Sequence, residues 1–88
     1  MRYNKHEIIE KLDAARQRAT YGALAGVVDG SARSVMSGEE KNPRNSWIVS
    51  KRKHQPTGYT TREKHRDLAK NSLVLETPEA LERWLQVA

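Results

Sequence analysis

Residues 20–37 decide the fold, and they read Thr-Tyr-Gly-Ala-Leu-Ala-Gly-Val-Val-Asp-Gly-Ser-Ala-Arg-Ser-Val-Met-Ser. Thr20 is a suitable N-cap for a helix over residues 21–28, whose apolar residues share one face. The dipeptide Asp29-Gly30 is a turn signal, and a second short helix is expected over residues 32–37. Two short helices joined by a tight turn predict a helix-turn-helix, a motif found in many DNA-binding domains.

The segments around this motif predict a winged arrangement. Upstream, residues 5–18 carry apolar side chains at helical spacing behind Asn4, a suitable N-cap, which predicts a first helix. Downstream, Trp-Ile-Val at residues 47–49 is typical of a strand, and Tyr-Thr-Thr at residues 59–61 is expected to be a short return strand. The expected fold class is therefore mainly α with a small β-hairpin, in the element order of a winged helix-turn-helix.

The last third of the chain predicts a less regular stretch and a final helix. Residues 63–70 are weakly helical in pattern, and residues 73–75 are extended. Residues 78–87 form an amphipathic pattern with Thr77 as a suitable N-cap. We expect residues 1–88 to fold as a single winged-helix-like domain.

The composition excludes several classes of protein. With 88 residues, the chain is long enough for one domain and too short for a large enzyme with a deep enclosed pocket. It contains no cysteine, so it has no disulfide and no thiolate ligand or nucleophile. Its three histidines show no ligand spacing, and we expect no metal site and no cofactor. The chain has no signal-peptide pattern and no run of ~20 apolar residues, which predicts a soluble cytoplasmic protein without a membrane partner.

Positive charge is concentrated in one part of the sequence. The chain has 16 Lys and Arg against 11 Asp and Glu, a formal net charge of +5. Residues 41–66 hold eight cations and one acid, a net +7, so the rest of the chain sums to −2. The eight cations are Lys41, Arg44, Lys51, Arg52, Lys53, Arg62, Lys64 and Arg66. Such a segment is typical of a polyanion-binding surface, and a merely solvated basic face is the alternative.

Five short motifs occur in order between residues 7 and 60. They are Ala19-Thr20-Tyr21-Gly22-Ala23-Leu24-Ala25, Ala32-Arg33-Ser34-Val35, Asn42-Pro43, Ser50-Lys51-Arg52 and Gly58-Tyr59. Arg33 lies nine residues before Asn42, and Ser50 lies eight residues after it. In this order and spacing the chain resembles the DNA-binding C-terminal domain of the alkylguanine-DNA alkyltransferases and their catalytically silent relatives, the alkyltransferase-like proteins.

This resemblance implies a mode of DNA binding. In the family, the helix-turn-helix enters the minor groove, and the arginine at the position of Arg33 replaces a flipped nucleotide in the base stack. The tyrosine at the position of Tyr21 packs against the adjoining phosphate, and the asparagine at the position of Asn42 braces the recognition helix. A guanidinium plane can recover part of the cost of extruding a base by stacking and hydrogen bonding.

Departures from the family pattern exclude its repair reaction. The reactive cysteine of the family falls on Ser50, whose hydroxyl is a poor nucleophile toward an alkyl group, and the activating histidine falls on Lys51. The preceding proline is Val49, and residues 61–88 do not match the family's C-terminal segment. We therefore expect a protein that is not an enzyme and that binds duplex DNA, with or without a preference for a flipped or modified base.

The expected site residues fall into two groups. The base pocket comprises Ser50, Gly58 and Tyr59. The DNA-contacting residues are Tyr21, Ser31, Arg33, Ser34, Lys41, Asn42, Arg44, Lys51, Arg52 and Lys53. Glu39 and Glu40 should face away from phosphate, which would repel them.

Two other functions fit the sequence. A protein-interaction or adaptor module would keep the fold without DNA binding and would offer the helix near residues 77–88 to a protein partner. A small enzyme would need Lys51 to activate Ser50, but neighbouring strand residues point to opposite faces, which argues against it. Tyr21 also fits an ordinary packing aromatic and Arg33 a solvated side chain, and Trp47 and Trp84 are expected in the core.

Overall fold

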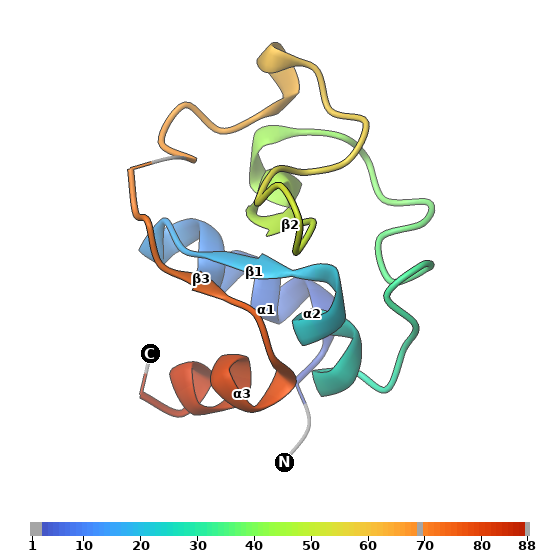
Figure 1. Cartoon of the computed structure of the whole chain (residues 1–88), viewed down its shortest axis with the longest axis vertical. Helices are drawn as coiled ribbons and strands as arrows, with labels where there is room; N and C mark the ends of the chain where they lie inside the picture. Colours follow the sequence, from blue (N-terminus) through green and yellow to red (C-terminus); the bar gives the residue numbers. More distant parts are fainter. Residues whose placement is uncertain (1–2, 69, 88) are drawn as a thin grey trace.

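Three short parallel strands form the centre of the domain (Figure 1). In the computed structural model, which describes residues 3–68 and 70–87, the strands are β1 (Arg18–Thr20), β2 (Ile48–Val49) and β3 (Val74–Leu75). The strand order is β2-β1-β3, with Ala19 paired to Ile48 on one side and to Leu75 on the other. All three strands are buried, as is typical of parallel strands that are covered on both faces.

The prediction of a β-hairpin is wrong. The strand at Ile48–Val49 is present, but it pairs in parallel with β1, which lies far upstream in the sequence. Residues 59–60 have no regular structure, and Thr61–Glu63 form a short 3-10 helix, η2. Ile48 and Val49 are 1% and 0% exposed, and the polar Thr60 and Thr61 could not have covered them in a two-stranded ribbon. The domain is thus partly helical with a small parallel sheet.

The first helix, α1 (Lys5–Ala15), is confirmed but ends earlier than expected. Its N-cap is Asn4, whose side chain accepts a hydrogen bond from the Glu7 backbone at 2.7 Å. Arg16 takes a left-handed conformation, with φ 57°, and closes the helix. The residues expected to continue the helix to Arg18 are therefore free to enter β1 and the core.

The second helix, α2 (Tyr21–Val27), begins behind Thr20 as expected, with Thr20 Oγ1 accepting from the Ala23 backbone at 3.1 Å. The helix expected over residues 32–37 does not form, and successive turns span residues 32–38 instead. This stretch is too short to nucleate a helix alone, and its serines compete for the backbone hydrogen bonds. Val35, 7% exposed, is its anchor in the core.

The third helix, α3 (Pro78–Val87), packs across α2 (Figure 1). Thr77 Oγ1 accepts from the Ala80 backbone at 3.1 Å, which confirms the expected cap. The two helices approach closely at Gly26, where an added β-carbon would lie 2.2 Å from Pro78 Cγ. The contact fixes α3 below the sheet.

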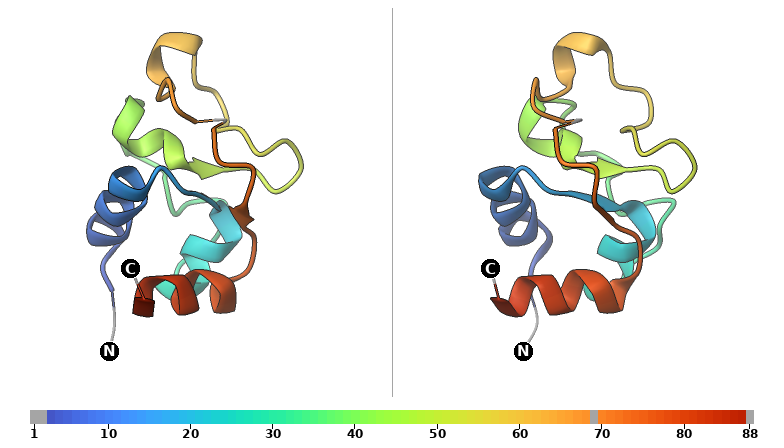
Figure 2. Two further views of the ribbon diagram at one scale, coloured as in Figure 1. Left: turned by 90° about the vertical axis from the view of Figure 1, so that its left-hand side faces the viewer. Right: turned by 60° about the vertical axis from the view of Figure 1, so that its left-hand side comes forward.

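A buried arginine holds two loops against the sheet. Arg18, 7% exposed, donates to the backbone oxygens of His54 and Asn71, each at 2.9 Å. Its Nε is buried without a hydrogen-bond partner, and burial lowers the pKa of the guanidinium. Through His54, Arg18 positions the loop over residues 50–58, which projects on the side of the sheet opposite to α1 (Figure 2).

The segment before β2 is a 3-10 helix, η1 (Pro43–Trp47). Trp47 is fully buried, as expected, and its Nε1 donates to Asp13 Oδ1 of α1 at 2.8 Å. Its ring lies 4.8 Å from that of His65. Trp84 is only partly buried against the core.

The weak helix expected over residues 63–70 is absent from residues 64–68, which form bends and turns, and residue 69 lies outside the described residues. No helix in the described part of the chain is long and apolar enough to cross a membrane.

Candidate nucleic-acid interface

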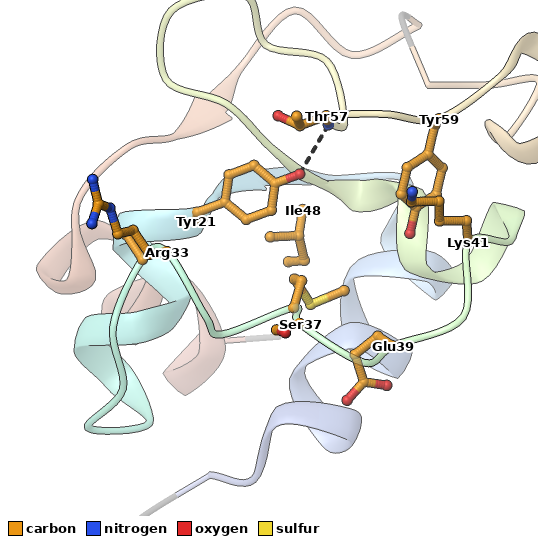
Figure 3. Close-up of a pocket in the computed structure, with 10 residues that line it drawn as sticks. Tyr21, Arg33, Ser37, Glu39, Lys41, Ile48, Thr57 and Tyr59 are labelled. Atoms are coloured by element: carbon orange, nitrogen blue, oxygen red, sulfur yellow. Dashed lines mark hydrogen bonds between the residues drawn. The ribbon is translucent and has the colours of Figure 1, made fainter.

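A hollow of about 420 Å³ lies where α2, the turns after it and the loop before η2 come together (Figure 3). Two tyrosine rings, Tyr21 and Tyr59, line it together with the buried side chain of Ile48. We call it the Tyr21–Tyr59 hollow. Its remaining residues are Ala32, Arg33, Met36, Ser37, Glu39, Lys41 and Thr57.

The ring of Tyr21 is held in place at both ends. Its backbone begins α2, and its hydroxyl accepts a hydrogen bond from the Thr57 backbone N–H at 2.9 Å (Figure 3). A tyrosine hydroxyl that accepts one hydrogen bond can still donate its own proton. Tyr21 is therefore a fixed aromatic wall with one O–H available to an acceptor such as a phosphate oxygen.

Two cations border the hollow from different segments. Lys41 passes so close to Gly58 that a β-carbon there would lie 3.3 Å from the Lys41 ammonium nitrogen. Gly58 has φ +77°, which favours glycine at this position, whereas the flexible end of Lys41 could move aside. Arg33 is exposed, and its guanidinium points away from Tyr59 on the other side of Tyr21 (Figure 3).

The acid in this hollow is neutralised by a lysine of α1. Lys5 Nζ lies 2.5 Å from Glu39 Oε2 and donates to the Val35 backbone oxygen at 2.9 Å. The hydrogen bond from Lys5 lowers the pKa of the Glu39 carboxyl, which stays ionised. The carboxylate is directed away from Tyr21, while the rest of the side chain lines the hollow (Figure 3). Lys5 thus ties the turns that carry Arg33 to α1.

A second hollow, of about 510 Å³, adjoins the first. Tyr21, Ala32 and Arg33 line both hollows. The second also contains Thr20, Gly22, Ser50, Lys51, Glu76 and Pro78, and we call it the Ser50–Glu76 hollow. A third hollow, of about 340 Å³, is lined by Ser50 and Gly58 together with Arg52, Lys53, Gln55, Pro56 and Thr57.

The expected base pocket is divided between these hollows. Tyr59 lines the first, Ser50 the second and third, and Gly58 the third. The reason is the bond between Thr57 and the Tyr21 hydroxyl, which draws the loop onto α2. The structure therefore places these three residues around Tyr21 and does not gather them in one cavity.

Ser50 closes a tight turn. Its Oγ accepts from the Lys53 backbone at 3.1 Å, and its backbone oxygen accepts from the His54 backbone at 2.8 Å. The His54 ring lies against Glu76 instead, with Nε2 to Oε2 at 3.3 Å. Among the described residues, no side-chain base forms a hydrogen bond with the Ser50 hydroxyl, and no cluster of three or more His, Asp and Glu is placed to hold a metal ion.

Three consecutive basic residues of the loop over residues 50–58 are exposed to solvent. Lys51, Arg52 and Lys53 are all exposed on the projecting loop (Figure 2). Ser31 and Ser34 are also exposed, and Ser31 Oγ accepts from the Arg33 backbone at 3.3 Å. These residues are accessible to a large ligand.

Two of the expected DNA contacts are directed elsewhere. Asn42 caps η1, with its side-chain oxygen accepting from the Asn45 backbone at 2.9 Å. It therefore shapes the approach to β2. Arg44 donates to the His6 backbone oxygen at 3.2 Å and lies against α1.

Tyr59 keeps its proton over the physiological range. Burial, and to a smaller extent Tyr21 and the nearby acids, raise its pKa to about 12. Its phenol can therefore donate a hydrogen bond in the hollow.

Several residues of the interface escape prediction from the sequence. Met36 and Ile48 give the first hollow an apolar surface, Thr57 contributes a backbone N–H, and Lys5 and Glu76 come from distant segments. Only Ile48 carried a signal, as a strand residue, because the other four depend on long-range contacts.

The arrangement combines aromatic rings, an apolar surface and cations, the set of groups that recognises a base joined to a phosphate. No protein-family model, curated protein or solved structure matches the chain. The chemistry of the site therefore carries the functional argument by itself.

Proposed function

We propose that this protein binds duplex DNA and catalyses no reaction on it. The observation that carries the proposal is the meeting of Tyr21, Arg33 and Lys41, from three separate segments, around adjoining hollows with two tyrosine rings. Aromatic surfaces flanked by cations suit the bases and the backbone of a nucleic acid.

The distribution of charge supports the same proposal. Lys51, Arg52 and Lys53 stand on a loop next to these hollows, and the surrounding segment carries the net +7. The one acid in the first hollow, Glu39, is paired with Lys5. Phosphate would therefore meet little repulsion from this hollow.

We further propose that the domain is a winged-helix variant of the alkyltransferase-like type, acting in the cytoplasm. In this view α2 and the turns over residues 32–38 take the place of the helix-turn-helix, and the loop over residues 50–58 takes the place of the wing. Tyr21 stands beside the DNA backbone, and Arg33, exposed at the meeting of the two hollows, serves as the wedge. The hydroxyl of Ser50, engaged in its own turn, supports binding without repair.

The proposal is tested by titrating a labelled duplex with the protein at several salt concentrations. If about five phosphates are neutralised, log K should fall against log salt with a slope of about −4 to −5. Mass spectrometry after incubation with an alkylated oligonucleotide should show no adduct. An absence of binding at low salt would overturn the proposal.

Arg33 distinguishes a wedge from a phosphate contact. Lysine can replace arginine at a phosphate but lacks the flat guanidinium that stacks in a helix. We expect Arg33→Lys to resemble Arg33→Ala and to weaken any preference for a mismatched or damaged base. Arg52→Ala is the control, because it should weaken all duplexes about equally. A 2-aminopurine duplex whose fluorescence does not change, together with a mild effect of Arg33→Lys, would leave Arg33 as a backbone contact.

A hollow between α1 and α3 favours a second candidate function, a protein-interaction module. It measures about 470 Å³ and is lined by Lys11, Ala14, Ala15, Trp84 and Val87. Val87 is 83% exposed beside the partly buried Trp84. If this adaptor function is the right one, the duplex titration should fail, and Trp84→Ala should abolish capture of a protein partner.

A further inference from the structure

The two hollows around Tyr21 form one groove with two compartments. They share a wall made of Tyr21, Ala32 and Arg33. Their volumes, about 420 and 510 Å³, each fall within the range of small-ligand sites, roughly 300–1,000 Å³. A single extruded base would occupy only one of them.

The first compartment has the chemistry of a base site. Tyr21 and Tyr59 present aromatic rings, and Ile48 and Met36 add apolar surface. The hydrogen bond from Thr57 fixes the Tyr21 ring, so a base can stack there without first ordering the side chain. Stacking on aromatic side chains tolerates any of the four bases.

The second compartment has the chemistry of a nucleotide joined to the first. Lys51 is exposed, where it can meet a bridging phosphate, while Arg33 stands on the shared wall, where it can act as the wedge between the two nucleotides and the base stack. Glu76 lines the same compartment next to His54 and would repel a phosphate placed beside it. A carboxylate accepts hydrogen bonds from an exocyclic amino group, such as N4 of cytosine. The backbone is thus directed toward Lys51 and the second base toward Glu76.

We infer that this groove binds two consecutive unpaired nucleotides of a DNA strand. The first base lies in the Tyr21–Tyr59 hollow, the second lies in the Ser50–Glu76 hollow, and the phosphate between them meets Lys51. The inference rests on the proposed DNA binding and deepens it by naming the preferred substrate, a duplex with a two-nucleotide unpaired step.

The test compares four labelled hairpin duplexes by fluorescence anisotropy at one low salt concentration. One is fully paired, one carries a single-nucleotide bulge, one a two-nucleotide bulge, and one a bulge of two abasic residues. We expect the two-nucleotide bulge to bind about tenfold more tightly than the paired duplex, the gain from about one stacked base, and more tightly than the other two. The abasic bulge separates stacking from mere flexibility without any change in the protein.

Two variants assign the compartments, and two more serve as controls. Tyr59→Leu keeps apolar volume but removes a ring, and should lose most of the preference for the two-nucleotide bulge. Glu76→Gln should weaken discrimination between cytosine and thymine at the second bulged position. Arg52→Ala should weaken all four duplexes alike, and Arg83→Ala, on α3, should change none of them. Thermal unfolding confirms that each variant is folded.

The relative affinities for the four duplexes distinguish the inference from the proposed duplex binding. Equal affinity for one- and two-nucleotide bulges, or for abasic and normal bulges, overturns the inference and leaves the proposed duplex binding in place. Binding to bulged but not to paired DNA supports the inference and overturns duplex binding as the function. An absence of binding to all four duplexes overturns both.

Discussion

The close approach of α2 and α3 predicts opposite effects for the same substitution at two glycines of one helix. Neither Gly22 nor Gly26 has a positive φ, so neither needs glycine for its backbone conformation. A β-carbon at Gly22 would meet nothing within 4 Å. A β-carbon at Gly26 would lie 2.2 Å from Pro78 Cγ and 2.6 Å from Pro78 Cβ.

The magnitudes follow from helix propensity and overlap. Replacing glycine by alanine stabilises a helix by up to about 1 kcal/mol, and about 0.5 kcal/mol is a suitable value near a helix end. Carbon atoms normally approach to about 3.5–4.0 Å, so the overlap at Gly26 exceeds 1 Å. The ring of Pro78 cannot rotate away, and overpacking of this kind costs about 1–3 kcal/mol. We expect Gly26→Ala to lower the free energy of unfolding by about 1–2 kcal/mol and Gly22→Ala to raise it slightly.

Thermal unfolding followed by circular dichroism measures both variants. For a domain of this size, 1 kcal/mol corresponds to a Tm shift of about 4–8 °C. Gly26→Ala should therefore lose about 5–10 °C, while Gly22→Ala should gain a few degrees. In a Pro78→Ala background, which removes Cγ, the cost of Gly26→Ala should shrink. A Gly26→Ala variant as stable as the wild type would refute the packing of α3 on α2 described here.

Three further predictions concern charge and titration. Because the bond from Lys5 lowers the pKa of Glu39, this pair contributes stability above the unfolded pKa of about 4.3, and the contribution is lost as pH falls through the lower folded pKa. In Glu39→Gln, the urea midpoint of unfolding should depend less on pH between pH 3 and 6 than in the wild type. Amide hydrogen exchange in the turns around Val35 should also be faster. A pH dependence equal to that of the wild type would contradict the pairing. The pKa of Tyr59, about 12, should appear as a late phase in absorbance titration, and stability should fall as pH rises from about 10 toward it; a Tyr59→Phe variant that keeps this phase would assign it elsewhere. In Arg18→Lys, the single ammonium group cannot bond both loop carbonyls as the forked guanidinium does. Urea denaturation should show that the free energy of unfolding falls by about 2 kcal/mol. An unchanged free energy of unfolding would show that the two hydrogen bonds are dispensable.

Local signals in the sequence identified the helices well. Asn4, Thr20 and Thr77 each cap the helix expected of them, because a cap depends only on the three or four residues that follow it. The end of α1 was missed, since Arg16 adopts a left-handed conformation without the glycine that usually marks it.

Pairing of strands was not readable from the sequence. Ile48–Val49 was recognised as a strand, but no strand was expected at its partner β1, where Arg18 was expected to end the first helix and Thr20 to cap the second. The choice between a local hairpin and a distant parallel partner depends on which pairing buries more apolar surface. Pairing β1 with β2 buries both Ala19 and Ile48. The helix expected over residues 32–37 failed for a different reason, because the stretch is too short to nucleate alone and its serines compete for the backbone hydrogen bonds.

The site was predictable only in part. Tyr21, Arg33 and Lys41 do border one hollow, and the cations of the loop over residues 50–58 are exposed. Arg44 lies against α1 through its hydrogen bond to the His6 backbone, a contact that leaves no trace in local spacing. Residue types suggested which side chains suit nucleic acid, whereas the direction of each side chain required the tertiary structure.

The position of β1 between two later strands has a consequence for how the chain folds. Both neighbours of β1 follow it in the sequence, and β3 lies more than fifty residues downstream. A chain emerging from the ribosome cannot complete the sheet until residues 74–75 are released, so we expect the sheet to close late and at the slower rates of folds with non-local pairing. A fragment truncated before β3 would expose the free edge of β1, a template for pairing between chains. The pairing of β3 with β1 therefore covers this edge and commits the domain to its native fold instead of aggregation.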